Sequence, residues 1–235
     1  MVAESFLYPF RDGSDRSALA ALLGCGLGTA IAGQLAVALY PATPWLVPAL
    51  VAPLPLVAWA GYCRHVVAST VADRDAPLPS FGDARARLRD GVVLLAVTVA
   101  YLAVPAGMLL VTVQGATRID PATITMETGT VVLLGSTLTM FVALAVGYVY
   151  PAVVARRLDR EDAPLFHPGG LLYVIRNPSY LVAWAAAMVV AFVGFGVSGQ
   201  LFGGRGVPGL LAGLVAVYAS VVAARLVGIG YVRSR

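Results

Sequence analysis

Residues 178–199 read PSYLVAWAAAMVVAFVGFGVSG, a run that contains no charged side chain. Crossing the hydrocarbon core of a bilayer as an α-helix takes about 20 predominantly apolar residues, so this run predicts a membrane-spanning helix. Comparable apolar runs lie at 18–40, 45–66, 91–113, 129–152 and 207–230. We therefore predict an all-α fold, a polytopic bundle of about six transmembrane helices, as a single integral membrane domain over residues 1–235.

The composition is typical of a chain whose main solvent is lipid. Hydrophobic residues make up 59% and charged residues 12% of the sequence, whereas a soluble domain is roughly 45–50% apolar and about 25% charged. The formal net charge is +4. The arginines are spread over the flanks of the apolar runs and form no basic domain of the kind that binds nucleic acid, so we expect no nucleic-acid partner.

The distribution of arginine sets the expected orientation, because cytoplasmic loops carry an excess of basic residues close to helix ends. Of the 16 basic residues, all but Arg118 and Arg205 fall on the side that an even number of spans assigns to both termini. We predict a multi-pass protein of the cell membrane with its N- and C-termini in the cytoplasm.

Three prolines interrupt the second apolar run. Pro48, Pro53 and Pro55 each remove a helical hydrogen bond and crowd the preceding turn. Membrane helices tolerate this where neighbouring groups satisfy the freed carbonyls. We expect the outer half of this helix to be kinked or partly unwound and packed inside the bundle.

An internal repeat relates two regions of the chain. The turn residues Asp75, Pro77 and Leu78 recur in the same local order as Asp162, Pro164 and Leu165. In the same register, Arg89 corresponds to Arg176. Each copy, about 45–114 and 129–199, predicts a descending helix, an acidic turn, a short interfacial helix and a returning helix.

The ends of the chain resemble a third copy in permuted order. YASVVAARL at 218–226 resembles YPAVVARRL at 150–158, which would make 207–235 together with 1–40 the third unit. Ser80 with Asp83 reads as a capping box ahead of the first short helix, and Pro168 opens the second. We expect two or three short interfacial helices on the cytoplasmic side.

A set of positions around the first turn resembles a known family. They are Gly61, Tyr62, Arg64, Leu78, Pro79, Phe81 and Gly91. The pattern resembles an uncharacterised family of archaeal multi-pass membrane proteins of haloarchaeal type, domain of unknown function 4013. The resemblance continues through the second copy to Tyr180 and departs at His167-Pro168, where a Phe-rich start would be expected. It implies a membrane protein and supplies no activity.

The sequence offers few candidates for chemistry. An ionisable residue within a membrane helix is by default a functional hypothesis, but the centres of the predicted spans carry none. The spacing of His, Cys and acidic residues matches no metal motif, and no nucleophile motif occurs. We expect no catalytic residue, no cofactor and no metal site, and predict that the protein is not an enzyme.

Arginines beside helix ends attract acidic lipid headgroups by about 1 kcal/mol per charge. We interpret a group of them as candidate headgroup or interfacial contacts: Arg64, Arg85, Arg87, Arg89, Arg156, Arg157 and Arg176.

Two functions remain open at this point. The first is a non-enzymatic membrane module that organises lipids or partner proteins, with membrane lipids, another membrane protein or a second copy of the chain as partners. The alternative is a transporter or channel for a small or apolar solute, without ion coupling through buried carboxylates. Internal repeats and broken helices favour this alternative, because transporters use both at their binding sites.

Overall fold

The computed structural model describes residues 2–11, 13–117, 126–159, 168–204 and 206–235. Within these ranges the chain is helical apart from short connections, and no strand occurs in them. Six segments of the described chain are long and apolar enough to cross a membrane. They are α2 (Arg16–Leu39), α3 (Leu46–Val51) with α4 (Pro53–Ala72), α5 (Ala84–Thr117), α6 (Met126–Asp159), α8 (Pro178–Gly203) and α9 (Val207–Ser234). The predicted fold class is confirmed.

Helix α9 lies at the centre of the packed part of the molecule. It contacts α2, α4, α6 and α8, and 50% of its most apolar stretch is buried. Glycines allow the close approach that packing in membranes requires: a Cβ added to Gly213 would lie 2.3 Å from the Gly26 carbonyl oxygen on α2. On the other side, a Cβ on Gly194 of α8 would lie 2.2 Å from the Ala219 Cβ.

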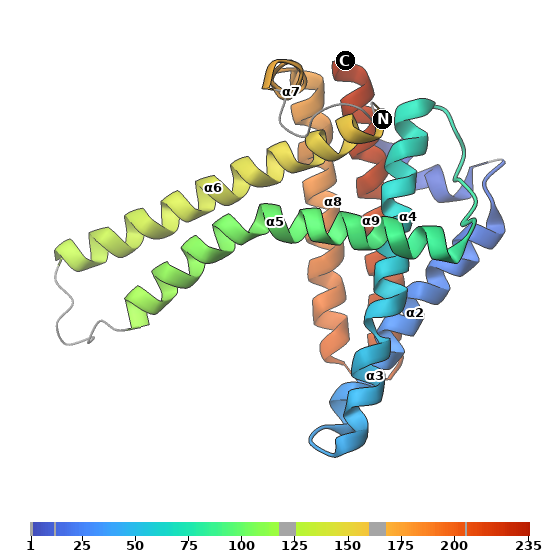
Figure 1. The fold of residues 1–235 in the computed structure, drawn as a ribbon, viewed down its shortest axis with the longest axis horizontal. Coiled ribbons are helices and arrows are strands. Elements are labelled where there is room, and N and C mark those ends of the chain that lie inside the picture. Colours follow the sequence, from blue (N-terminus) through green and yellow to red (C-terminus); the bar gives the residue numbers. More distant parts are fainter. Residues whose placement is uncertain (1, 12, 118–125, 160–167, 205) are drawn as a thin grey trace.

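Helices α5 and α6 form a long hairpin that extends away from this core (Figure 1). In the figure the hairpin runs across the direction followed by α4, α8 and α9. Only 6% of the most apolar stretch of each helix is buried. Lipid or another membrane protein is therefore needed to cover most of the hairpin.

The helical hydrogen-bond pattern of the proline-rich span is interrupted at Ala52, but the backbone there stays helical (φ −52°, ψ −37°), so the span is not unwound at this point. Helix α3 ends at Val51 and α4 begins at Pro53, with the Ala52 N–H donating to the Pro48 carbonyl at 2.9 Å. Pro53 costs little as the first residue of α4, because an N–H there has no helical partner. Pro55 lies in the first turn of the same helix.

The outer half of this span is not packed inside the bundle, so that part of the prediction is wrong. Leu50 is 75% exposed and Val47 is 67% exposed. Lipid chains are as apolar as a protein interior, so the apolar side chains of this half need no protein cover.

The first repeat copy has no separate interfacial helix. Helix α5 runs without a break from Ala84, and Asp83 caps it by accepting a hydrogen bond from the Arg85 N–H at 3.0 Å. The cap is therefore Asp83 and not Ser80. The residues expected to form a short helix are the first turns of α5.

The second copy does contain a separate short helix, α7 (Pro168–Ile175). It is separate because Asn177 precedes Pro178, and a residue before proline disfavours the helical conformation. Asn177 instead caps α8 by accepting from the Ser179 N–H at 2.9 Å. A further short helix that the sequence did not reveal is α1 (Val2–Leu7), which is followed by the single turn η1 (Tyr8–Phe10).

Candidate functional site

Residues 73–83, which we call the strap, join α4 to α5 and are bound to α4 by two aromatic side chains. The Tyr62 O–H donates to the Pro79 carbonyl at 2.6 Å. Its ring stacks on Phe81, with 5.6 Å between the ring centroids. The strap is therefore held against the helix that precedes it.

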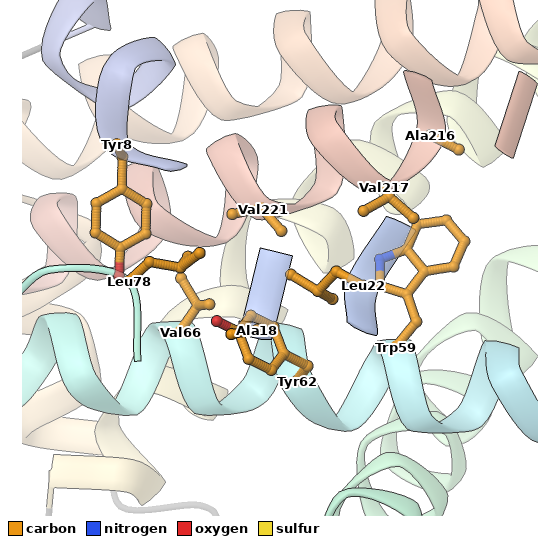
Figure 2. Close-up of a cluster of buried hydrophobic side chains, with 10 residues drawn as sticks. All are labelled: Tyr8, Ala18, Leu22, Trp59, Tyr62, Val66, Leu78, Ala216, Val217 and Val221. Atoms are coloured by element: carbon orange, nitrogen blue, oxygen red, sulfur yellow. The ribbon is translucent and has the colours of Figure 1, made fainter. Parts of the chain in front are cut away.

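The N-terminal segment holds the strap from the other side. The Tyr8 O–H donates to the Pro77 carbonyl at 3.3 Å, and the Leu78 N–H donates to the Ser14 hydroxyl at 3.3 Å. Leu78 is buried in the apolar cluster that joins η1, α2, α4 and α9 (Figure 2). An exposed ion pair between Arg11 and Asp75, 3.9 Å apart, lies beside these contacts.

Arg225 of α9 contacts α4, the strap and the N-terminal segment. Its side chain donates to the Thr70 hydroxyl at 3.0 Å and to the Arg74 carbonyl, and the residue is only 3% exposed. The guanidinium carbon lies 4.3 Å from the centroid of the Tyr8 ring, a cation–π geometry. Burial raises the pKa of Tyr8, with Arg225 opposing the rise, so the hydroxyl remains a hydrogen-bond donor.

Two glycines bring α4 and α5 into backbone contact. A Cβ added to Gly61 would lie 1.9 Å from the Arg87 carbonyl oxygen, and one added to Gly91 would lie 1.9 Å from the Val57 carbonyl oxygen. No larger side chain fits at either position while the helices keep this separation. The crossing therefore depends on glycine at both positions.

Asp90 sits at this crossing between two arginines. One carboxylate oxygen pairs with Arg64, and the other lies 3.6 Å from Arg87 Nη1. The Arg87 side chain is 11% exposed, and its Nε has no hydrogen-bond partner among the described residues. One carboxylate for two guanidinium groups leaves this group with a net positive charge.

A cavity of about 270 Å³ opens beside Arg64, between α4, α5 and α6. Arg157 of α6 lines it as well. The rest of its wall is apolar and consists of Val93, Leu94, Val97, Val153, Val154 and Leu158. The structure thus brings two of the predicted lipid contacts, from different helices, to one cavity.

A family model described as protein of unknown function (DUF4013) matches residues 46–203. The chain belongs to this family. No curated protein and no solved structure matches it. The matched region begins at α3 and ends with α8, so the central helix α9 lies outside it.

The positions that carry the family pattern are brought together by the fold. Tyr62 reaches Pro79 and Phe81, and Gly61 lies at the crossing with α5. Arg64 binds Asp90, the residue before Gly91. In this chain the family pattern therefore describes one junction between α4, the strap and α5.

The remaining predicted arginine contacts are dispersed. Arg85 and Arg89 are exposed on α5, whereas Arg87 turns inward to Asp90. Arg156 packs against α7, where a Cβ added to Gly170 would lie 2.7 Å from its guanidinium.

Arg176 lines a separate cavity of about 450 Å³ at the turn between α7 and α8, together with Leu172, Tyr173, Asn177 and Pro178. The second copy of the turn motif, Asp162, Pro164 and Leu165, lies outside the described residues. Within the described chain, no group of three His, Cys, Asp or Glu side chains is arranged to hold a metal ion.

A second junction, which the sequence did not reveal, joins the ends of α4, α6 and α9. Asp159 of α6 accepts from the Tyr231 O–H at 3.1 Å and from Arg235 at 2.5 Å. Arg235 also donates to the Val71 carbonyl of α4 at 3.3 Å. The available signal was a cluster of polar residues at the end of the last apolar run, but nothing in that run identifies its partners.

The two repeat copies share one structural detail. A Gly-Tyr pair occurs on each descending helix, Gly61-Tyr62 on α4 and Gly147-Tyr148 on α6, one residue out of the register that aligns Asp75 with Asp162. The Tyr148 O–H donates to the Ile175 carbonyl at 2.5 Å, much as Tyr62 donates to the strap. In both copies a tyrosine binds a backbone carbonyl of the segment that leads to the next helix.

Proposed function

We propose that this protein is a non-enzymatic membrane module that organises lipids around the α5–α6 hairpin. The observation that carries this proposal is the hairpin itself, two apolar helices of which only 6% of the most apolar stretch is buried. It is joined to the core close to the Arg64–Arg87–Asp90 group. A surface of this kind combines long apolar faces with basic groups near one end, as an acidic lipid requires.

The polar contacts of the junction support a structural role for these residues. Tyr62, Tyr8 and Arg225 all direct hydrogen bonds to backbone carbonyls of the strap. These hydrogen bonds hold the strap against α4, α9 and the N-terminal segment. They occupy the donors that a catalytic site would direct at a substrate.

The proposal includes an archaeal cell membrane with both termini in the cytoplasm. The distribution of arginine supports the orientation, and the resemblance described above supports the source. We also propose that α3–α5 and α6–α8 are two copies of one unit, on the basis of their shared turn sequence and the parallel roles of Tyr62 and Tyr148.

Native mass spectrometry of the protein, released gently from its own membrane, tests the proposed function. We expect lipid to remain bound at a fixed stoichiometry. A protein that carries no lipid at any ratio, under conditions where a known lipid-binding membrane protein keeps its lipid, would contradict the proposal.

One observation favours transport as a second candidate. Prolines interrupt the helical hydrogen bonds of the span that contains α3 and α4 at Ala52, and proline-interrupted spans mark the binding sites of many transporters. Solute flux into liposomes that contain the protein distinguishes the two candidates. Flux above that of empty liposomes would favour transport.

A further inference from the structure

We infer that the cavity between α4, α5 and α6 binds one phospholipid, with Arg64 and Arg157 holding its anionic phosphate and the apolar wall taking the start of an acyl chain. This inference rests on the proposed function and names the lipid class and the site. The two guanidinium groups come from different helices, and both line the same cavity.

The charges at the cavity favour a phosphate. Guanidinium groups bind phosphate oxygens through paired hydrogen bonds of fixed geometry. Asp90 pairs with Arg64 and positions its side chain at the cavity edge. Because Asp90 also pairs with Arg87, its single negative charge cannot neutralise both Arg64 and Arg87.

The wall of the cavity follows the helix repeat. Residues four apart lie on the same helix face, and the wall contains such pairs on both helices: Val93 with Val97 on α5, and Val154 with Leu158 on α6. Arg157 lies close to the end of α6 at Asp159. The apolar stripes therefore lead from the charged end of the cavity along the hairpin, as an acyl chain would.

The size of the cavity limits what it can enclose. Small-molecule sites occupy roughly 300–1,000 Å³, and this cavity has about 270 Å³. It can hold a phosphate group and the beginning of one chain, while the remaining chain lies on the exposed face of the hairpin, where Val99 is 68% exposed. A free phosphate ion would leave the apolar wall without a partner, so the site fits a lipid better.

Titration of the delipidated full-length chain in detergent, read by native mass spectrometry, tests the inference. The probes are phosphatidylglycerol, phosphatidylcholine with the same acyl chains, and inorganic phosphate. We expect one bound phosphatidylglycerol, weaker binding of phosphatidylcholine, and no retained phosphate. Arg157→Gln should weaken phosphatidylglycerol binding about fivefold, the factor that corresponds to one charge near the membrane surface.

Two matched pairs of variants separate the site from general effects. Val97→Trp fills the cavity and should abolish the bound lipid, whereas Val37→Trp adds the same ring to an exposed position of α2, away from the hairpin, and should leave it bound. Arg16→Gln removes an exposed charge at the start of α2 that does not line the cavity, and it serves as the control for Arg157→Gln. Each variant is first checked for a thermal unfolding midpoint close to that of the unmodified protein. If Val97→Trp fails this check, Arg157→Gln alone decides.

The outcomes distinguish the site from the function. Lipid that stays bound to Val97→Trp and Arg157→Gln with unchanged affinity overturns this site and leaves the proposed function standing. Absence of any bound lipid on the unmodified protein overturns both. Retention of inorganic phosphate with the affinity of the lipid overturns the lipid as the source of the phosphate.

Discussion

The substitution Gly61→Ala should separate α4 from α5 at their crossing. The added Cβ would lie 1.9 Å from the Arg87 carbonyl oxygen, whereas an ordinary contact begins near 3.4 Å. The helices would have to move apart by about 1.5 Å at this point. Inserting a methyl group into a well-packed contact costs roughly 1–3 kcal/mol, and the Arg64–Asp90 pair at the same crossing would be disturbed as well.

Gly107→Ala is the matched control for this experiment. Gly107 lies within α5, and nothing would come within 4 Å of its added Cβ. Both substitutions stabilise the helix by roughly 0.5–1 kcal/mol, because alanine loses less conformational entropy on folding than glycine. The difference between the two variants therefore isolates the clash at the crossing. We expect the free energy of unfolding of Gly61→Ala to be about 1–3 kcal/mol lower than that of Gly107→Ala.

Equilibrium unfolding in detergent micelles, followed by tryptophan fluorescence, measures the two free energies. Equal stability of Gly61→Ala and Gly107→Ala would refute the reasoning, because it would mean that α4 and α5 do not touch at Gly61 in the folded protein. Greater stability of Gly61→Ala would refute it more strongly.

Three further predictions follow from other parts of the molecule. Arg225→Leu removes the side chain that donates a hydrogen bond to the Arg74 carbonyl and should destabilise the fold by about 1–3 kcal/mol. Limited proteolysis should then cut the strap faster. An unchanged cleavage rate would show that Arg225 does not hold the strap in place. Hydrogen bonds from Ser17 lower the pKa of Asp15, which caps α2. This cap should contribute its full stability above the ordinary Asp pKa of about 3.9 and lose it as the pH falls through the lowered value. The thermal unfolding midpoint of Asp15→Asn, measured between pH 2 and pH 6 (roughly the range in which Asp titrates), should lack this pH dependence. A pH profile identical to that of the unmodified protein would contradict the prediction. A cysteine at Gly129, in a chain whose own cysteines are replaced by alanine, should react with an impermeant maleimide from the outer side of the membrane only; labelling from the cytoplasmic side would overturn the predicted orientation.

Several features of this protein could be predicted because their causes are local. Apolar runs of sufficient length are enough to predict the six spans. The interruption of the helical hydrogen bonds before Pro53 follows from the missing N–H of proline. The short helix α7 ends where Asn177 precedes Pro178, again a local effect.

The candidate site could be predicted only in part. The arginines were identifiable as basic residues beside helix ends, and the family pattern marked Tyr62, Arg64 and Gly91. Which arginines share a cavity could not be predicted, because Arg64 and Arg157 lie on different helices far apart in the sequence. The role of Arg225 was missed for the same reason, since its partner Thr70 is 155 residues away.

The sequence by itself determined that the chain is a set of six apolar helices and which residues form their cores, but not that α5 begins as early as Ala84 or that α6 runs on to Asp159. Only the tertiary structure decided that α9 lies at the centre and that α5 and α6 leave the core as a hairpin. The physical reason is that lipid chains are as apolar as a protein interior. A membrane helix therefore has the same hydrophobic composition whether lipid or protein covers it, and its neighbours are selected by close packing and hydrogen bonds between distant residues.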